Sequence, residues 1–290
     1  MSDSPHRAAP PGVSALSGAR LRRFETISLA VCLALVIALA WLYLALVDMS
    51  MAPMAVDAAD AEIAAGHVGM AMDDMPGMAM PESDSSMAPL SYGLLAAMWI
   101  VMMIGMMLPS ASPMMLIVAR MSHGQAGAGA ARLGPWAFAL GYLIAWVGFS
   151  LVAAAAQLGL QAEVLSAHAM AIRSGVIGGG VLIAAGLYQW TPLKAACLTK
   201  CRSPLGHFMS AWRPGRFGAL RVGIVHGLFC VGCCWLLMAI MFVFGVMSLP
   251  WLGALAAFVL VEKLAPKGEW IARGGGVAML GAGVYLIVAG

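Results

Sequence analysis

The chain has 290 residues, of which 62% are hydrophobic and only 10% are charged, and its formal net charge is +3. Soluble domains carry about 25% charged residues, so this composition cannot cover a globule with polar side chains. It excludes a soluble dinucleotide-binding enzyme, a nucleic-acid-binding domain and a secreted disulfide scaffold, and it predicts an integral membrane protein. A second anomaly is the 24 methionines, nine of which fall between residues 48 and 90.

Apolar segments of about 20 residues predict membrane-spanning helices. We expect an all-α polytopic membrane protein, a bundle of about seven transmembrane helices, with six as the alternative. Pro250 separates the fifth and sixth segments, because proline lacks an amide donor and interrupts helices. The sixth segment is short and is either a span or a re-entrant segment. The predicted spans are 26–47, 91–118, 135–157, 174–190, 219–247, 250–264 and 271–289.

The distribution of charge predicts the orientation. Three arginines between residues 20 and 23 precede the first span, whereas 48–90 contains eight acidic residues and neither Lys nor Arg. The positive-inside rule therefore places the N-terminus in the cytoplasm of a bacterial inner membrane and 48–90 in the periplasm. The predicted organisation is a disordered cytoplasmic tail at 1–25, an uncleaved transmembrane anchor at 26–47, a Met-rich acidic loop at 48–90 and a six-span core at 91–290. That core includes a basic cytoplasmic loop at 191–218.

The outer loop repeats methionine at short spacings among small residues, prolines and acids, which do not form a packed core. Thioether sulfur is a soft, neutral ligand that suits Cu(I), so the repeats favour copper capture. The alternative is a low-complexity linker of biased composition. The candidate ligands in this loop are His67, Met70, Met72, Met75, Met78 and Met80.

The second span carries Met98, Met102 and Met106 on one helical face. Such a stripe is either core packing, which methionine suits well, or a row of soft ligands. Pro109 and Pro113 are expected to break this helix near mid-membrane, where broken helices are tolerated if they are buried in protein or line a cavity.

The fifth span contains His226, Cys230, Cys233, Cys234 and Met241, which fall on one face about 100° wide. Imidazole and thiolate ligands on adjacent turns can converge on one ion. A single buried cysteine is usually a small hydrophobe, but three with a histidine favour a metal site. Gly227 and Gly232 lie beside them, and glycines in such a helix let a neighbouring helix approach closely.

Cys197 and Cys201 in the basic loop are also candidate metal ligands, because their four-residue spacing places both sulfurs on one side of a helical turn. The alternative is an idle pair in a stretch that binds anionic lipid headgroups. Cys32 is expected to serve packing alone. Glu262 and Lys263 suit either a functional role or anchoring at the interface.

Three stretches together resemble a known family. They are Met98-Trp99 through Met106-Met107-Leu108-Pro109 with Pro113; Trp190-x-Pro192-Leu193-Lys194-x-x-Cys197-Leu198-x-x-Cys201-Arg202-x-Pro204; and Gly227 to Cys230 with Gly232-Cys233-Cys234-Trp235, Met238 and Glu262-Lys263. This combination is similar to a bacterial family of unknown function described as predicted metal-binding integral membrane proteins. The resemblance covers about residues 90–290; it implies metal binding and leaves the activity open.

These patterns predict a membrane copper-handling protein that captures copper at the outer loop and holds or relays Cu(I) for transport or for delivery to a cuproenzyme. The alternative is a copper-dependent membrane oxidoreductase, or a subunit of one, with the buried His/Cys cluster as its redox site. The weakness of this alternative is its single buried histidine, because copper oxygenase centres generally have several imidazole ligands, so a non-enzymatic role is favoured. A third interpretation is a purely structural membrane scaffold that packs with methionine. The expected partners are the lipid bilayer and a periplasmic copper chaperone or cuproenzyme subunit; nucleic acid is excluded and oligomerisation is left open.

Overall fold

The computed structural model describes residue 24 and residues 26–49, 88–122, 128–161, 172, 174–202, 217–246 and 248–289. The elements of regular structure in these ranges are α-helices, which confirms the all-α prediction. They are the N-terminal helix Thr26–Met49, α2 Ala88–Ser122, α3 Ala128–Gln161, α4 Gly175–Tyr188, α5 Pro192–Arg202, α7 Gly218–Ala239, α8 Met241–Phe244, α9 Leu249–Leu264 and α10 Gly268–Ala289.

Several of the described helices are long and apolar enough to cross a membrane, which confirms the polytopic membrane fold. α4 meets the test only together with α5, across a bend of 63°. α9 has 16 residues, fewer than the about 20 that a span needs. The predicted count of about seven is therefore not confirmed: the described ranges contain five spans, or six with the bent pair. The five are Thr26–Met49, Tyr92–Ala119, Gly134–Leu160, Gly218–Phe244 and Gly268–Ala289.

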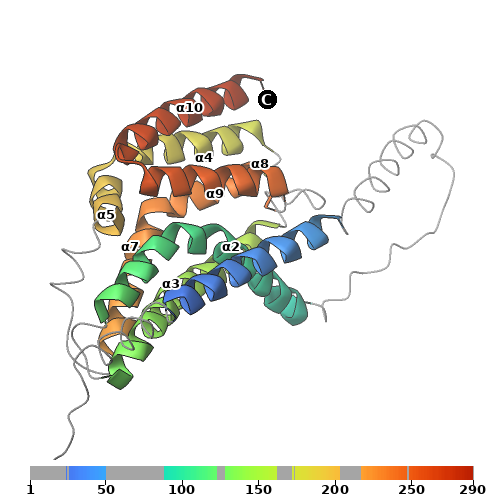
Figure 1. The fold of residues 1–290 in the computed structure, drawn as a ribbon. Coiled ribbons are helices and arrows are strands. Elements are labelled where there is room, and N and C mark those ends of the chain that lie inside the picture. The colour runs from blue at the N-terminus through green and yellow to red at the C-terminus, as the bar shows by residue number, and fades with distance from the viewer. Residues whose placement is uncertain are drawn as a thin grey trace, which may run out of the picture.

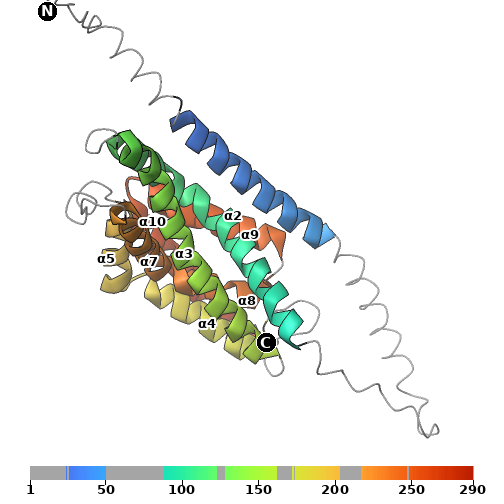
Figure 2. The ribbon, with the colours of Figure 1, turned by 90° about the horizontal axis from the view of Figure 1, so that it is seen from below.

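The helices form two groups that α7 connects. In Figure 1, α4, α9 and α10 lie side by side, and α2, α3 and the N-terminal helix form the second group. α7 packs against α3 in the second group and against α4 in the first, and α5 packs against both α7 and α9. Seen from below, the N-terminal helix lies along α2 (Figure 2). Only 17% of its most apolar window is buried, as expected of an anchor that faces lipid.

The expected break in the second span is wrong, because α2 is one continuous helix with Pro109 and Pro113 inside it. Each proline removes one i→i−4 hydrogen bond and frees a carbonyl one turn earlier. The Gly105 carbonyl, freed by Pro109, accepts a hydrogen bond from Trp41 Nε1 of the N-terminal helix at 3.1 Å. The Pro109 carbonyl, freed by Pro113, accepts one from Ser112 Oγ at 2.9 Å. Neighbouring donors thus replace the lost bonds and the helix continues.

A row of glycines brings α3 and α7 into backbone contact. A Cβ on Gly223 of α7 would overlap the Phe138 carbonyl oxygen of α3, and Gly141 of α3 is equally close to the α7 backbone. One turn along α7, a Cβ on Gly227 would lie 2.6 Å from Ala145 Cβ. Small residues allow this approach between membrane helices, whose association depends on close packing. We call Gly141, Gly223 and Gly227 the glycine seam; it confirms the close approach expected at Gly227.

Candidate metal centre

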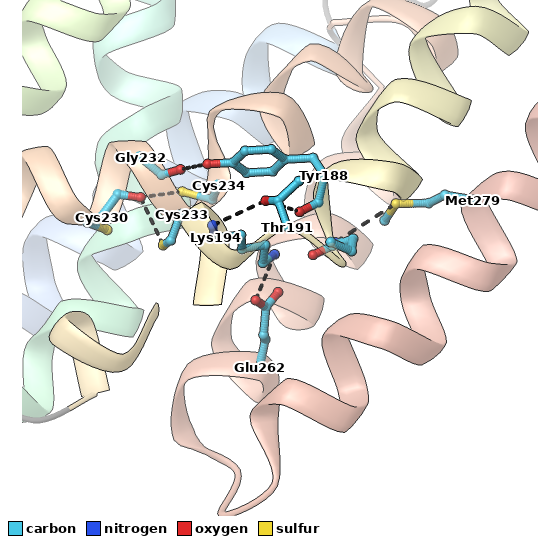
Figure 3. A network of polar contacts seen from close by, with 10 residues as sticks. Tyr188, Thr191, Lys194, Cys230, Gly232, Cys233, Cys234, Glu262 and Met279 are labelled. Carbon is cyan, nitrogen blue, oxygen red and sulfur yellow. Dashed lines mark hydrogen bonds and ion pairs between the residues drawn. The ribbon is translucent and has the colours of Figure 1, made fainter. Parts of the chain in front are cut away.

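α7 carries three buried cysteines, and the thiols of two of them bond the backbone carbonyl of the third. The exposed fractions of Cys230, Cys233 and Cys234 are 2%, 2% and 1%. The Cys233 and Cys234 thiols both donate to the Cys230 carbonyl oxygen, at 3.0 and 2.9 Å (Figure 3). The helical spacing of i, i+3 and i+4 accounts for this convergence, because those residues are neighbours on a helix surface.

The Cys230 sulfur of α7 contacts side chains of α3 and α9, and both of these side chains also bond α2. Lys263 Nζ of α9 donates to Cys230 Sγ at 2.8 Å and to Ser110 Oγ of α2 at 3.1 Å. The Tyr142 hydroxyl of α3 lies 3.2 Å from the same sulfur and 3.2 Å from the Met107 carbonyl oxygen of α2. The sulfur therefore has a cation and a hydroxyl beside it, both of which complement a negatively charged thiolate.

α5 adds a fourth thiol from outside α7. Cys201 packs against the core that contains the α7 thiols, with the Cys230 and Cys233 side chains beside it. Cys197, one turn earlier, faces Gly232 of α7, where a Cβ would lie 3.2 Å from Cys197 Sγ. We call Cys201, Cys230, Cys233 and Cys234 the thiol cluster. Residues 192–202, assigned by sequence to a basic loop, are thus a helix packed on α7.

The thiol cluster is held by hydrogen bonds to the protein. Within the described ranges, no three His, Cys, Asp or Glu side chains are arranged to hold a metal ion. Because the Cys233 and Cys234 thiols point to the Cys230 carbonyl, both side chains must turn from it to share an ion. Thiolates are ligands for Cu(I) and zinc, so the four thiols are chemically suited to bind Cu(I).

His226 and Met241, expected on the same face, have other neighbours. His226 is 5% exposed, and its ring centroid lies 5.6 Å from that of Phe138 and 6.0 Å from that of Tyr142. Met241 begins α8 and lines an apolar cavity of about 330 Å³ between α4, α8, α9 and α10. Their ligand roles stay predictions.

Seven methionines of α2, from Met98 to Met115, lie in the same hydrophobic core as the thiols. Met98 is 9% exposed, and Met102 and Met106 are fully buried. Met103 and Met107 are fully buried as well, so methionine covers about half the circumference of this part of α2. Packing suits such a distribution, and the ligand roles of Met98, Met102 and Met106 stay predictions. Tyr142 connects the two sets, because its hydroxyl contacts both the Met107 carbonyl and Cys230 Sγ.

The candidate ligands of the outer loop lie outside the described residues, and their roles stay predictions. These are His67, Met70, Met72, Met75, Met78 and Met80.

Sequence reasoning missed Tyr142, Ser110 and Lys194. Tyr142 and Ser110 have no local signal, because their importance comes from contacts with other helices. Lys194 forms an ion pair with Glu262 of α9 at 2.7 Å (Figure 3), with exposed side-chain fractions of 1% and 3%. Buried ionisable residues of a membrane protein are functional candidates, and that rule would have identified Lys194 had its helix been recognised as packed.

Comparison with known proteins gives one match. The family described as PpoB2, copper chaperone, matches residues 96–286, more than half of the chain. No curated protein and no solved structure matches it. The matched region includes the methionines of α2, α5 with its two cysteines, and all of α7, and it confirms the resemblance to metal-binding membrane proteins. The chain belongs to the PpoB2 copper chaperone family, and it is a copper-handling membrane protein.

Proposed function

We propose that the protein captures copper at its Met-rich outer segment and holds Cu(I) at the thiol cluster, for delivery to a cuproenzyme or across the bilayer. The observation that carries this proposal is the group of three buried α7 cysteines, with Lys263 at the Cys230 sulfur and Cys201 of the packed helix α5 nearby. Sulfur ligands select Cu(I) over hard cations. Copper is the cargo here, and the chain supplies the ligands.

The route inward runs from thioethers to thiols. Residues 49–87 lie in the periplasm under the proposed orientation, with the N-terminus in the cytoplasm of a bacterial inner membrane. Thioethers carry no proton at ordinary pH and so bind copper without releasing one. The α2 methionines share a core with the thiol cluster, so copper passes from one sulfur to the next by ligand exchange. The partner is a periplasmic copper chaperone or a cuproenzyme subunit.

Copper content measures the role of the thiol cluster directly. The full-length protein, purified in detergent under reducing conditions with Cu(I) supplied, is expected to retain copper. Cys230→Ser/Cys233→Ser/Cys234→Ser should lose it. Cys32→Ser is the matched control, since Cys32 of the N-terminal helix should leave the copper content unchanged. A wild-type protein that retains no copper, or a triple variant that retains it fully, would contradict the proposal.

The capture step has its own test. Deleting residues 49–87 should slow copper loading of the thiol cluster at limiting copper while leaving the copper held at that cluster at excess copper unchanged. Equal loading rates for both proteins would remove the capture role. A Cu(II) paramagnetic resonance signal that turns over with an organic substrate would favour the oxidoreductase alternative, whereas copper that exchanges with chelators and stays silent supports handling.

A further inference from the structure

α5 is attached to α9 at both of its ends. Near its start, the ammonium of Lys194 lies 2.7 Å from the carboxylate of Glu262. At its end, the guanidinium of Arg202 donates to the carbonyl oxygens of Ala265 and Pro266, the latter at 3.0 Å. These carbonyls follow the C-terminus of α9, the helix end at which a cation is favourable. Two separate polar contacts therefore fix the position of α5 along α9.

α5 is also a distinct unit of the chain. It begins at Pro192, a residue suited to the first helical position, and the Thr191 hydroxyl accepts a hydrogen bond from the Lys194 amide at 3.3 Å. A bend of 63° separates it from α4. α4 is itself tied to α7, because the Tyr188 hydroxyl donates to the Gly232 carbonyl. The start of α5 is therefore fixed by the packing of α4 on α7, and the orientation of its helix axis depends on its contacts with α9.

The face of α5 that holds Lys194 is the face that holds the thiol. Residues 194, 198 and 201 follow the i, i+4, i+7 spacing of one helical stripe. Lys194 and Leu198 are 1% and 2% exposed, and Cys201 packs against the core that contains the α7 thiols. Turning α5 about its axis would move all three side chains together. The ion pair at position 194 therefore sets where the Cys201 sulfur lies.

The buried pair is poorly explained by stability alone. Desolvating two charges offsets most of their attraction, and replacing such pairs with apolar groups is often neutral or stabilising. The pair is a close ion contact, and within the described residues the Lys194 ammonium has no aligned hydrogen bond. A charge pair of this kind is best suited to selecting one arrangement of two helices among several.

We propose that Lys194, Glu262 and Arg202 form a latch that positions the Cys201 thiol in the thiol cluster and so sets how many sulfurs bind copper. The three residues act through Cys201 and are positioning residues. The proposal rests on the proposed function, because it concerns copper held at the same cluster.

The test removes the ion pair without leaving a buried charge. The neutral double variant Lys194→Met/Glu262→Gln is made in the wild-type and in the Cys201→Ser backgrounds. Glu269→Gln is the matched control, since Glu269 is an exposed carboxylate in the first turn of α10. Cu(I) affinity is measured by competition with a chromophoric chelator, and the number of sulfur ligands by X-ray absorption. A thermal unfolding scan confirms that each variant is folded.

The double variant should weaken Cu(I) binding about 10- to 100-fold, the range for losing groups that orient metal ligands, and should lower the sulfur count by one. Cys201→Ser should have the same two effects, and adding the double variant to it should change neither further. The control should match wild type.

Two results would overturn the latch. In one, Cys201→Ser leaves the affinity and the sulfur count unchanged while the triple variant of the α7 cysteines still loses copper; the proposed function then stands without the latch. In the other, the double variant weakens binding equally in both backgrounds, which would make the pair a general structural contact.

Discussion

Gly223→Ala should destabilise the protein, because this residue allows α3 and α7 to touch. The new methyl group would overlap the Phe138 carbonyl oxygen and lie 3.0 Å from Phe138 Cα. These are backbone atoms, so no side-chain rotation relieves the overlap and the helices must move apart. Overpacking costs about 1–3 kcal/mol, and the higher helix propensity of alanine returns about 1 kcal/mol. Because the overlap is with backbone atoms, the cost lies at the upper end of that range, so the net loss is about 2 kcal/mol, which corresponds to a drop in Tm of roughly 4–8 °C.

The matched control is Gly148→Ala on α3, where a Cβ would meet nothing within 4 Å. The same chemical change there brings only the gain in propensity, so its Tm should stay equal or rise. The assay is thermal unfolding of both variants and wild type in one detergent, followed by circular dichroism. If Gly223→Ala unfolds at the same temperature as Gly148→Ala, the helices are not in backbone contact and the reasoning is refuted.

Two further substitutions test contacts around the site. Tyr142→Phe keeps the ring but removes the hydroxyl 3.2 Å from Cys230 Sγ; Cu(I) affinity in chelator competition should fall about tenfold, and unchanged affinity would show that the hydroxyl does not support the ligand. Trp41→Phe removes the donor to the Gly105 carbonyl and should lower the free energy of unfolding by about 1 kcal/mol. That loss should be smaller in a Pro109→Ala background, because the backbone amide restored at position 109 can donate to the same carbonyl. An equal loss in both backgrounds would show that Trp41 does not replace the hydrogen bond removed by Pro109.

The extent of α2 could be predicted from sequence, but its continuity could not. Apolar length is a local property, so the expected span 91–118 agrees closely with Tyr92–Ala119. Whether Pro109 breaks the helix depends on a donor for the Gly105 carbonyl, and that donor is Trp41, 64 residues away. Nothing in the sequence around the proline reveals it.

In the candidate metal centre too, features set by local helix spacing could be predicted and features set by helix docking could not. The three α7 cysteines were predicted to share a face because helical spacing alone determines it, and all three are buried. The approach of Cys201 was not predicted, because it depends on the docking of α5. Lys194, whose pairing with Glu262 fixes that docking, looked like one charge among many in a basic stretch. Helix periodicity carries no information about such a pairing between distant segments.

The glycine seam has a consequence for redesigning this protein. Glycine is already the smallest residue, so a single replacement at the seam can only push α3 and α7 apart and never draw them closer. The spacing of the α3 and α7 backbones beside Tyr142 and Cys230 is consequently set by main-chain atoms. An engineer who changes the ligands on α7 to retune the preferred ion should therefore leave Gly141, Gly223 and Gly227 unchanged, so that this spacing is kept.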